Sequence, residues 1–149
     1  MIRYASLPEG SIQRIELLRS QFKDETGLVA LYLFGSVAEG NVKPLSDIDL
    51  AVLLNGKIPK MDQLDKELSL RAKISDILLT DEFDLVVLNS APVHFAFKII
   101  KDGKLLFCKD EMILTSFIEK TISYYLDFKY YKEEFNSVFL EGLNKKYHG

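Results

Sequence analysis

Residues 31–56 read LYLFGSVAEGNVKPLSDIDLAVLLNG, and this stretch decides which fold we expect. Asp47 and Asp49 open the apolar segment 47–54, which otherwise has the composition of a buried strand. Side chains at positions i and i+2 of a strand point to the same face, so the two carboxylates are expected to project together. Two carboxylates at low dielectric repel each other unless a cation compensates them, and hard oxygen ligands suit Mg²⁺. The pattern therefore predicts a magnesium site.

A Gly-Ser pair, Gly35-Ser36, follows the apolar run of residues 28–34, which we interpret as another buried strand. A glycine at the end of a strand lets the backbone approach a phosphate closely. The backbone N–H groups that follow, together with the serine hydroxyl, are expected to hold the two phosphates of a nucleotide that leave as pyrophosphate. A Gly-Ser pair alone is weak evidence, and a single aspartate could merely cap a turn. The interpretation therefore depends on the whole combination.

A third acidic residue, Asp84, stands near the start of the apolar segment 83–88. A charge at that position has no packing role. If this segment lies beside residues 47–54 in a sheet, Asp84 can reach Asp47 and Asp49. Its expected role is to help hold the metal and to activate an incoming hydroxyl for in-line attack at phosphorus.

The segments between these strands favour helices, which predicts an α/β (α+β) fold with a small mixed β-sheet flanked by helices. The first two strands are expected to be neighbours because their link is short. The helix over residues 62–79 is expected to begin at Asp62 and to bury a stripe of Leu64, Leu68, Ala72 and Leu79. The other expected elements are a helix capped by Ser11 and ended by Gly27, a short helix over 37–43, a helix over 92–101, a strand over 105–108, and a long helix from Asp110 to the region of Gly142.

Length and composition set further bounds. The 149 residues predict a single domain over 1–149, with a core at about 10–108 and a C-terminal helical segment at about 110–145. A net charge of −3 lacks the basic footprint of a direct nucleic-acid binder. The single Cys108 excludes an intrachain disulfide and a cysteine-built zinc site. Because the chain shows neither a signal pattern nor a membrane-length apolar run, we expect a cytoplasmic protein without membrane contact.

The spacing of Gly35-Ser36, ten residues, and Asp47-Ile48-Asp49 resembles the signature of the nucleotidyltransferase superfamily that includes DNA polymerase β and kanamycin nucleotidyltransferase. Within that superfamily, GSVAEGNVKPLSDIDLAVLL and FDLVVLNSAPVHFAFKIIKDGKLLF are most similar to minimal nucleotidyltransferase (MNT) antitoxins of the MntA type. The resemblance covers roughly residues 28–108. It implies a nucleotidyltransferase fold, with Asp47, Asp49 and Asp84 as catalytic ligands of Mg²⁺ and with Gly35 and Ser36 holding the triphosphate of ATP.

The same resemblance implies an antitoxin that forms a hetero-oligomer with a HEPN-domain ribonuclease toxin. Such an antitoxin transfers AMP from ATP to a tyrosine hydroxyl of the toxin and releases pyrophosphate. Two alternatives stay open: an antitoxin that acts by occlusion without catalysis, and a small-molecule nucleotidyltransferase of the aminoglycoside type. An acidic triad favours catalysis, because a pure binder has no reason to keep like charges buried together.

Four charged residues bear on the expected binding of phosphates. Glu39 stands where many family members carry an arginine, and an acid that faces the site is expected to weaken triphosphate binding. Lys98, Lys101 and Lys104 could contact phosphates, but lysines of this kind usually face solvent, and we assign them no role.

The segment from Asp110 to the C-terminus holds nine of the seventeen aromatic residues. Its apolar residues follow helical spacing, but Tyr124, Tyr130 and Tyr131 fall on other faces of the expected helix. A helix that only packs on a core needs one apolar stripe, whereas tyrosine and phenylalanine are enriched at interfaces. Both a core role and an interface with another chain are therefore open for this segment.

Overall fold

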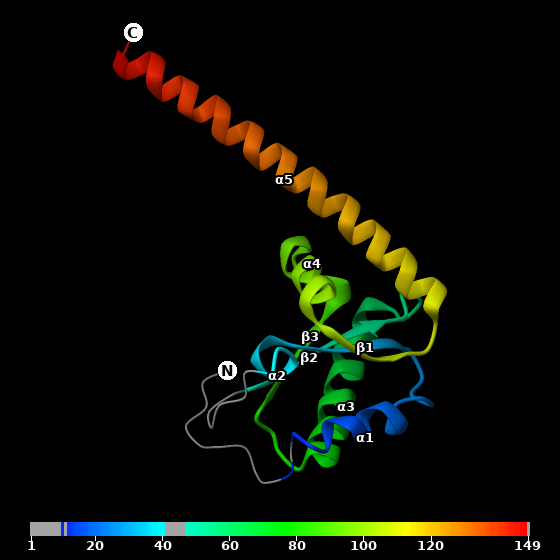
Figure 1. Cartoon of the computed structure of the whole chain (residues 1–149). Coiled ribbons are helices and arrows are strands. Elements are labelled where there is room, and N and C mark those ends of the chain that lie inside the picture. The colour runs from blue at the N-terminus through cyan, green and yellow to red at the C-terminus, as the bar shows by residue number, and fades with distance from the viewer. Residues whose placement is uncertain (1–9, 11, 41–46, 149) are drawn as a thin grey trace.

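The computed structural model describes residues 10, 12–40 and 47–148, with side chains as far as residue 143. The strands in this part of the chain are β1 (Leu28–Phe34), β2 (Ile48–Leu54), β3 (Phe83–Val87) and β4 (Lys104–Cys108), in the sheet order β3-β2-β1-β4 (Figure 1). Strand β1 pairs antiparallel with both β2 and β4, whereas β2 and β3 run parallel. The predicted mixed α/β sheet is therefore confirmed, as is the pairing of the first two strands.

Both faces of this sheet are covered, because successive residues of a strand point to opposite sides. Helices α1 (Ile15–Gln21) and α3 (Lys60–Leu78) lie on one face, and α4 (Val93–Asp102) and the start of α5 (Glu111–His148) lie on the other (Figure 1). The short α2 (Gly35–Ala38) follows β1, and a 3₁₀ turn at Leu88–Ser90 follows β3. In β2, Ile48, Leu50 and Val52 face α1 and α3, while Ala51 and Leu53 face α4 and α5.

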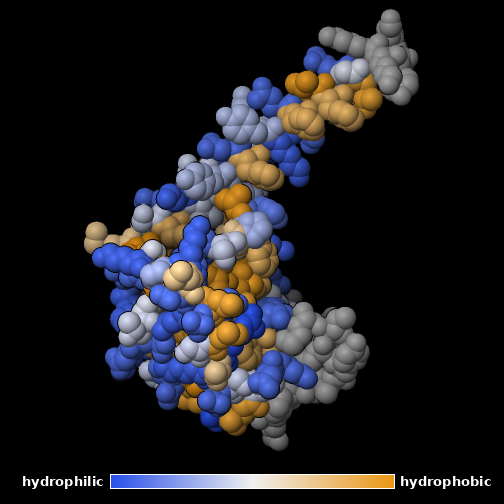
Figure 2. Space-filling view, turned by 180° about the vertical axis from the view of Figure 1, so that it is seen from behind, coloured by the Kyte–Doolittle hydropathy of each residue, from blue (hydrophilic) through white to orange (hydrophobic). Residues whose placement is uncertain are grey.

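Helix α5 divides into a packed first part and a projecting second part. Its first part lies against α4, where Phe97 stacks on Tyr125 with ring centroids 3.8 Å apart. Every residue from 126 to 142 is exposed, and this part of the helix extends away from the rest of the described structure (Figures 1 and 2). None of the helices in the described ranges has the length and apolar character needed to cross a membrane.

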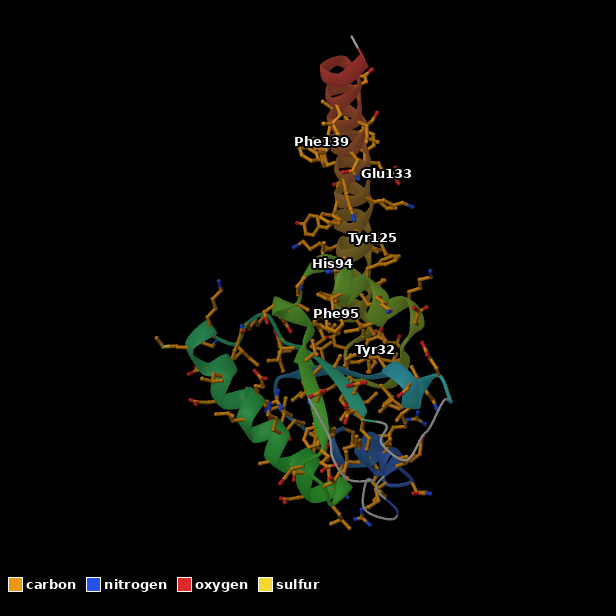
Figure 3. All side chains as sticks on the ribbon, turned by 90° about the vertical axis from the view of Figure 1, so that its left-hand side faces the viewer. Tyr32, His94, Phe95, Tyr125, Glu133 and Phe139 are labelled. Atoms are coloured by element: carbon orange, nitrogen blue, oxygen red, sulfur yellow. The ribbon has the colours of Figure 1, made fainter. Side chains whose placement is uncertain are left out.

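His94, near the start of α4, marks the point where α5 leaves the body of the protein (Figure 3). It is exposed, and its ring stacks on Phe128 with centroids 6.1 Å apart. Because His94 pairs with Phe128 and Phe97 with Tyr125, α4 and α5 run antiparallel.

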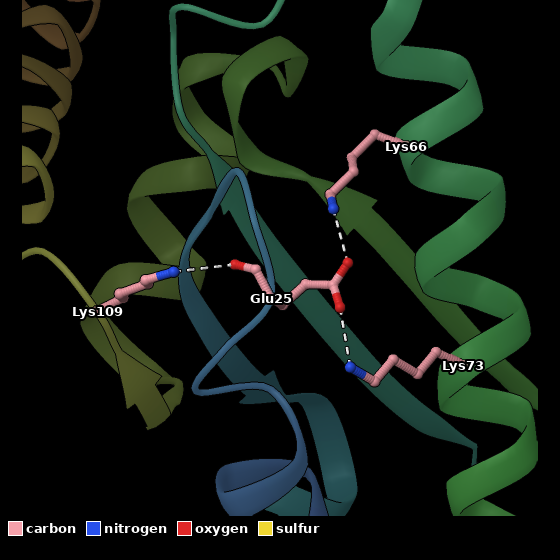
Figure 4. A network of polar contacts seen from close by, with 4 residues as sticks. All are labelled: Glu25, Lys66, Lys73 and Lys109. Carbon is pink, nitrogen blue, oxygen red and sulfur yellow. Dashed lines mark hydrogen bonds and ion pairs between the residues drawn. The ribbon is translucent and has the colours of Figure 1, made fainter.

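Glu25 joins the loop before β1 to two other parts of the fold (Figure 4). Its carboxylate accepts hydrogen bonds from Lys66 at 2.6 Å and Lys73 at 2.8 Å on α3, and its backbone carbonyl accepts one from Lys109 at 3.3 Å. Burial raises the pKa of Glu25, but the two lysines of α3 outweigh that effect and leave the pKa below its usual value. This network fixes α3 against the loop that leads into β1.

The buried face of α3 is not the one expected from the sequence. Leu70, Ile74 and Leu78 are the residues that α3 buries. The expected stripe was wrong, because Leu64, Leu68 and Leu79 are all more than half exposed. Two leucine-containing faces satisfy helical spacing in this segment, and the sheet packs on only one of them. Asp62 is also not the cap: the helix begins at Lys60, after Pro59.

Other boundaries differ by short stretches. Helix α1 ends at Gln21 rather than at Gly27, which takes a φ of +82° before β1. Helix α2 begins at Gly35, two residues earlier than expected, and ends at Ala38. The predicted cap Ser11 and the expected extension of α2 to residue 43 lie outside the described residues. The last helix is longer than expected and reaches His148.

Candidate active site

The structure brings two of the predicted acidic residues face to face. Asp49 of β2 and Asp84 of β3 are partners in the parallel register of these strands. Both alternate with residues that face α1 and α3, so both lie on the α4 side of the sheet. Asp47 lies just before β2, and all three residues are half-buried. The condition set for Asp84, that its strand lies beside that of Asp49, is met.

The proximity of these carboxylates affects the protonation of Asp49. Burial, followed by repulsion from Asp84 and then from Asp47, raises the pKa of Asp49 from 3.8 to about 6. A group with this pKa is partly protonated in a mildly acidic solution. A bound cation would remove the repulsion and restore the charged form of Asp49.

Gly35 makes room for one of these carboxylates. Its φ is +78°, in the left-handed region that glycine adopts without strain. A Cβ at this position would overlap Oδ2 of Asp49 and would lie 3.2 Å from its Cγ. The sequence suggested a glycine that admits a phosphate. The structure supplies a second reason, since any side chain here would displace the Asp49 carboxylate.

A pocket of about 280 Å³ opens beside Gly35, between α2 and α4. Phe34 and Phe95 form one apolar wall, with their rings edge to face and centroids 5.8 Å apart. The rest of the lining consists of Gly35, Ser36, Glu39, Lys98, Ile99 and Asp102. The three aspartates predicted as ligands do not line this pocket, and Asp49 adjoins it only through its close approach to Gly35.

The pocket includes residues of α4 that the sequence did not assign to the site. Lys98 lines it, although lysines of this segment were left without a role. Phe95, Lys98 and Asp102 are three and four positions apart, so they share one face of α4. That spacing was visible in the sequence, but nothing in the sequence showed that this face of the helix meets Ser36. Glu39 also lines the pocket, so the acid that replaces the family's arginine does face the site.

The carboxylate oxygens of Asp47, Asp49 and Asp84 are of the kind that a hard divalent cation prefers, but the three side chains are not grouped closely enough to form a complete metal site. Among residues 10, 12–40 and 47–148, no three His, Cys, Asp or Glu side chains are grouped in a way that could hold a metal ion. Mg²⁺ is commonly held by one or two carboxylates together with substrate phosphates, so a preformed three-carboxylate cage is not required. The anion of Asp49 is destabilised by burial and by repulsion from Asp84 and Asp47, and such an ion would stabilise it.

Carboxylates that face each other on parallel strands, next to a Gly-Ser turn and a small pocket, are the arrangement that nucleotidyl transfer would use. Residues 16–112 match the family model described as polymerase beta, nucleotidyltransferase. Because that match covers well over half of the chain, the chain belongs to this family.

The chain is also similar in sequence to a curated enzyme. Spectinomycin 9-adenylyltransferase of Staphylococcus aureus is 24% identical over 90 residues, which are 58% of this chain and 34% of that protein. The chain thus spans about a third of the length of these curated relatives.

Similarity in structure extends over most of the chain. A chain from the crystal structure of a toxin-antitoxin with AMP-PNP has a TM-score of 0.63 and 26% identity, covering 85% of this chain and 98% of that one. A chain from the tri-AMPylated Shewanella oneidensis HEPN toxin in complex with MNT antitoxin has a TM-score of 0.57 and 25% identity, covering 87% and 96%. The resemblance to MNT-domain antitoxins that the sequence indicated is therefore confirmed.

Proposed function

We propose that this protein is an antitoxin that transfers AMP from ATP to a tyrosine hydroxyl of a HEPN-domain toxin, with Mg²⁺ as cofactor. The observation that carries the proposal is the direct register of Asp49 with Asp84, with Asp47 one residue before the strand. Two facing carboxylates on the sheet have no packing function, and burial together with repulsion from Asp84 raises the pKa of Asp49. Likeness to chains of toxin-antitoxin structures, one with AMP-PNP and one with an AMPylated toxin, supports the choice of donor and acceptor.

The reaction is an in-line displacement at the α-phosphorus of ATP. The tyrosine oxygen forms a bond to that phosphorus, and the bond from phosphorus to the oxygen bridging the α- and β-phosphates breaks, so that pyrophosphate leaves. The phenolic proton passes to Asp84, the carboxylate assigned to activate the hydroxyl. Bound Mg²⁺ supplies positive charge that offsets the triphosphate and the acidic residues.

The remaining groups bind and orient the nucleotide. Gly35 and Ser36 face the pocket and are assigned to the β- and γ-phosphates. Lys98, from the opposite wall, adds a positive charge within the same pocket. Glu39 and Asp102 oppose it, so the pocket alone carries more negative than positive charge. Triphosphate binding is therefore expected to depend strongly on the divalent cation.

The test is AMP transfer to the protein encoded by the neighbouring gene, which we expect to be the HEPN-domain toxin. The two proteins are mixed with ATP and Mg²⁺, and intact mass is followed. We expect the toxin to gain the mass of AMP, and Asp47→Asn combined with Asp49→Asn to abolish the gain. Asp62→Asn, on the first turn of α3, is the matched control and should transfer AMP normally. Absence of any mass gain with the wild-type protein would refute the proposal.

Two observations favour other functions, and the same experiment distinguishes them from AMP transfer to the toxin. Similarity to spectinomycin 9-adenylyltransferase favours small-molecule transfer, so spectinomycin is included as an alternative acceptor. The exposed second part of α5 favours an antitoxin that acts by occlusion. Neutralisation of the toxin at full potency by the Asp47→Asn, Asp49→Asn variant, with no mass change, identifies occlusion instead of catalysis.

A further inference from the structure

The apolar face by which α5 packs on α4 continues past the N-terminal end of α4. Residues seven positions apart return to nearly the same face of a helix. Leu114, Thr121, Phe128 and Phe135 form one such series, and Phe117, Tyr124, Tyr131 and Val138 form a second beside it. Their alternation at three and four positions is the pattern of a helix that packs along a second helix over its whole length.

Burial along the first series changes where α4 begins, whereas in the second series Tyr124 is already 55% exposed. Leu114 and Thr121 are 6% and 5% exposed, whereas Phe135 is 68% exposed. The change occurs at Phe128, which still stacks on His94 near the first residue of α4. We call the uncovered continuation, Phe128, Tyr131, Phe135 and Val138, the distal seam; orange and blue surfaces alternate along this part of the molecule in Figure 2.

The distal seam is large enough to be an interface. A complete aromatic side chain offers about 200 Å², so these four partly exposed side chains present roughly 400 Å² of apolar surface. That is comparable with the largest apolar patch of a typical monomer, which is often functional. Phe139, stacked on Phe135 at 6.3 Å, extends the same face.

The charge beside the distal seam limits what can occupy it. Asp127, Glu134 and Glu141 are seven positions apart and form an acidic row along one edge of the seam. In helix pairs, the residues at these edge positions face the edge of the partner helix and determine which partner is accepted. A partner with a basic edge is favoured here, and one with an acidic edge is disfavoured.

A second copy of this chain does not meet these conditions in either orientation. In a parallel pair, the two distal seams would lie side by side. The N-terminal part of the second α5 would then have to occupy the face of the first α5 that α4 already covers. In an antiparallel pair, the acidic row of one copy would face the acidic row of the other. A helix of a different protein, continuing the line of α4, avoids both conflicts.

We propose that the distal seam is the docking site for a helix of a different protein, with apolar residues at heptad spacing and lysine or arginine along the edge that meets Asp127, Glu134 and Glu141. The proposal rests on the proposed function for one point only, that this partner is the HEPN-domain protein that accepts AMP. Docking on α5 would then hold the acceptor to the enzyme by contacts remote from the reacting atoms.

The test measures binding separately from transfer. Titration calorimetry with the neighbouring HEPN-domain protein uses the Asp47→Asn, Asp49→Asn variant as the parent, so that no AMP is transferred. Tyr131→Ala and Phe135→Ala should each weaken binding about 30-fold or more, as expected for aromatic anchors of an interface. Leu126→Ala and Leu140→Ala are matched controls, because these leucines are 56% and 59% exposed on another face of α5, and should change affinity less than about threefold.

A charge-reversal arm tests the chemistry of the partner. Glu134→Lys with Glu141→Lys should weaken binding about tenfold at low salt, and the loss should shrink as salt rises. Glu119→Lys, exposed on another face, should leave affinity unchanged. Since all the altered side chains are exposed, circular dichroism should show unchanged helix content.

Several outcomes would overturn the proposal. They are no binding by the parent, equal losses in seam and control variants, stronger binding after charge reversal, or a dimer of the isolated chain that Phe135→Ala dissociates in sedimentation. Failure of the proposed function has a different signature, because the wild-type protein would then bind its partner through the seam and transfer no AMP.

Discussion

Replacement of Gly35 by alanine should damage the site far more than it damages the fold. The added Cβ would lie 3.2 Å from Cγ of Asp49 and closer still to Oδ2. The residue also has a φ of +78°, which costs an alanine about 1 kcal/mol. Gly40 provides a close control, because its φ is +79° and a Cβ there would meet no atom of the described residues within 4 Å. The two substitutions share the backbone strain, and only Gly35→Ala adds the clash.

The expected size of the effect follows from that clash. To restore an ordinary contact distance, the Asp49 carboxylate must move by roughly 1 Å, and a displacement of that size in a catalytic group costs about 100-fold in rate. This corresponds to about 2.7 kcal/mol of transition-state stabilisation. Both variants should lose about 1 kcal/mol of unfolding free energy, with Gly35→Ala slightly worse.

The assay compares the two variants in two measurements. Urea denaturation gives the free energy of unfolding, and AMP transfer to the HEPN-domain protein at saturating ATP gives the rate. We expect Gly35→Ala to transfer AMP about 100-fold more slowly than Gly40→Ala at similar stability. Equal transfer rates for the two variants would refute the assignment of Asp49 as a catalytic group held in place by the absence of a side chain at residue 35.

Three other predictions follow from the described geometry. Between about pH 4 and 6 the folded protein holds more protons on Asp49 than the unfolded chain does, so Asp49 should make the metal-free protein less stable as pH rises through this window. Because the lowered pKa of Glu25 acts in the opposite direction, urea titrations should compare the wild-type protein with Asp49→Asn, whose stability relative to the wild type should rise with pH; parallel profiles would contradict the prediction. Glu39→Gln should raise affinity for ATP by about three- to tenfold in calorimetry, since one of the pocket's negative charges is removed, and unchanged affinity would mean that Glu39 does not face the phosphates. Leu70→Ala should cost about 2–5 kcal/mol of unfolding free energy and Leu64→Ala less than about 0.5; a reversed order would mean that the other face of α3 packs on the sheet.

The sequence was most informative where a residue contradicted its surroundings. Asp49 and Asp84 are charges in apolar strands, and that conflict, together with the Gly-Ser pair, indicated one site on the condition that the two strands are neighbours; their register in β2 and β3 meets this condition. The sequence was least informative where two faces of one helix both had the apolar spacing of a buried face. In α3, Leu64 with Leu68 and Leu70 with Ile74 both follow helical spacing, and only the position of the sheet distinguishes them.

Lys98 shows a different limit of sequence reasoning. Its place on one face of α4 could be deduced from the spacing of Phe95 and Asp102. The meeting of this face with Ser36 depends on how a helix late in the fold crosses the end of β1, which is a long-range contact without a local signal. Gly35 shows the same limit. A glycine after a strand is compatible with a positive φ, but its close approach to Asp49 has no local signal in the sequence.

Helix α4 connects the pocket with α5. One of its faces contributes Phe95 and Lys98 to the pocket, and another holds α5 through His94 and Phe97. A rigid helix of ten residues cannot move at one of these contacts without moving at the other. Occupancy of the pocket and the position of α5 are thus thermodynamically linked: if a ligand in the pocket favours one position of α4, a partner on α5 that favours the same position must strengthen the binding of that ligand by the same factor.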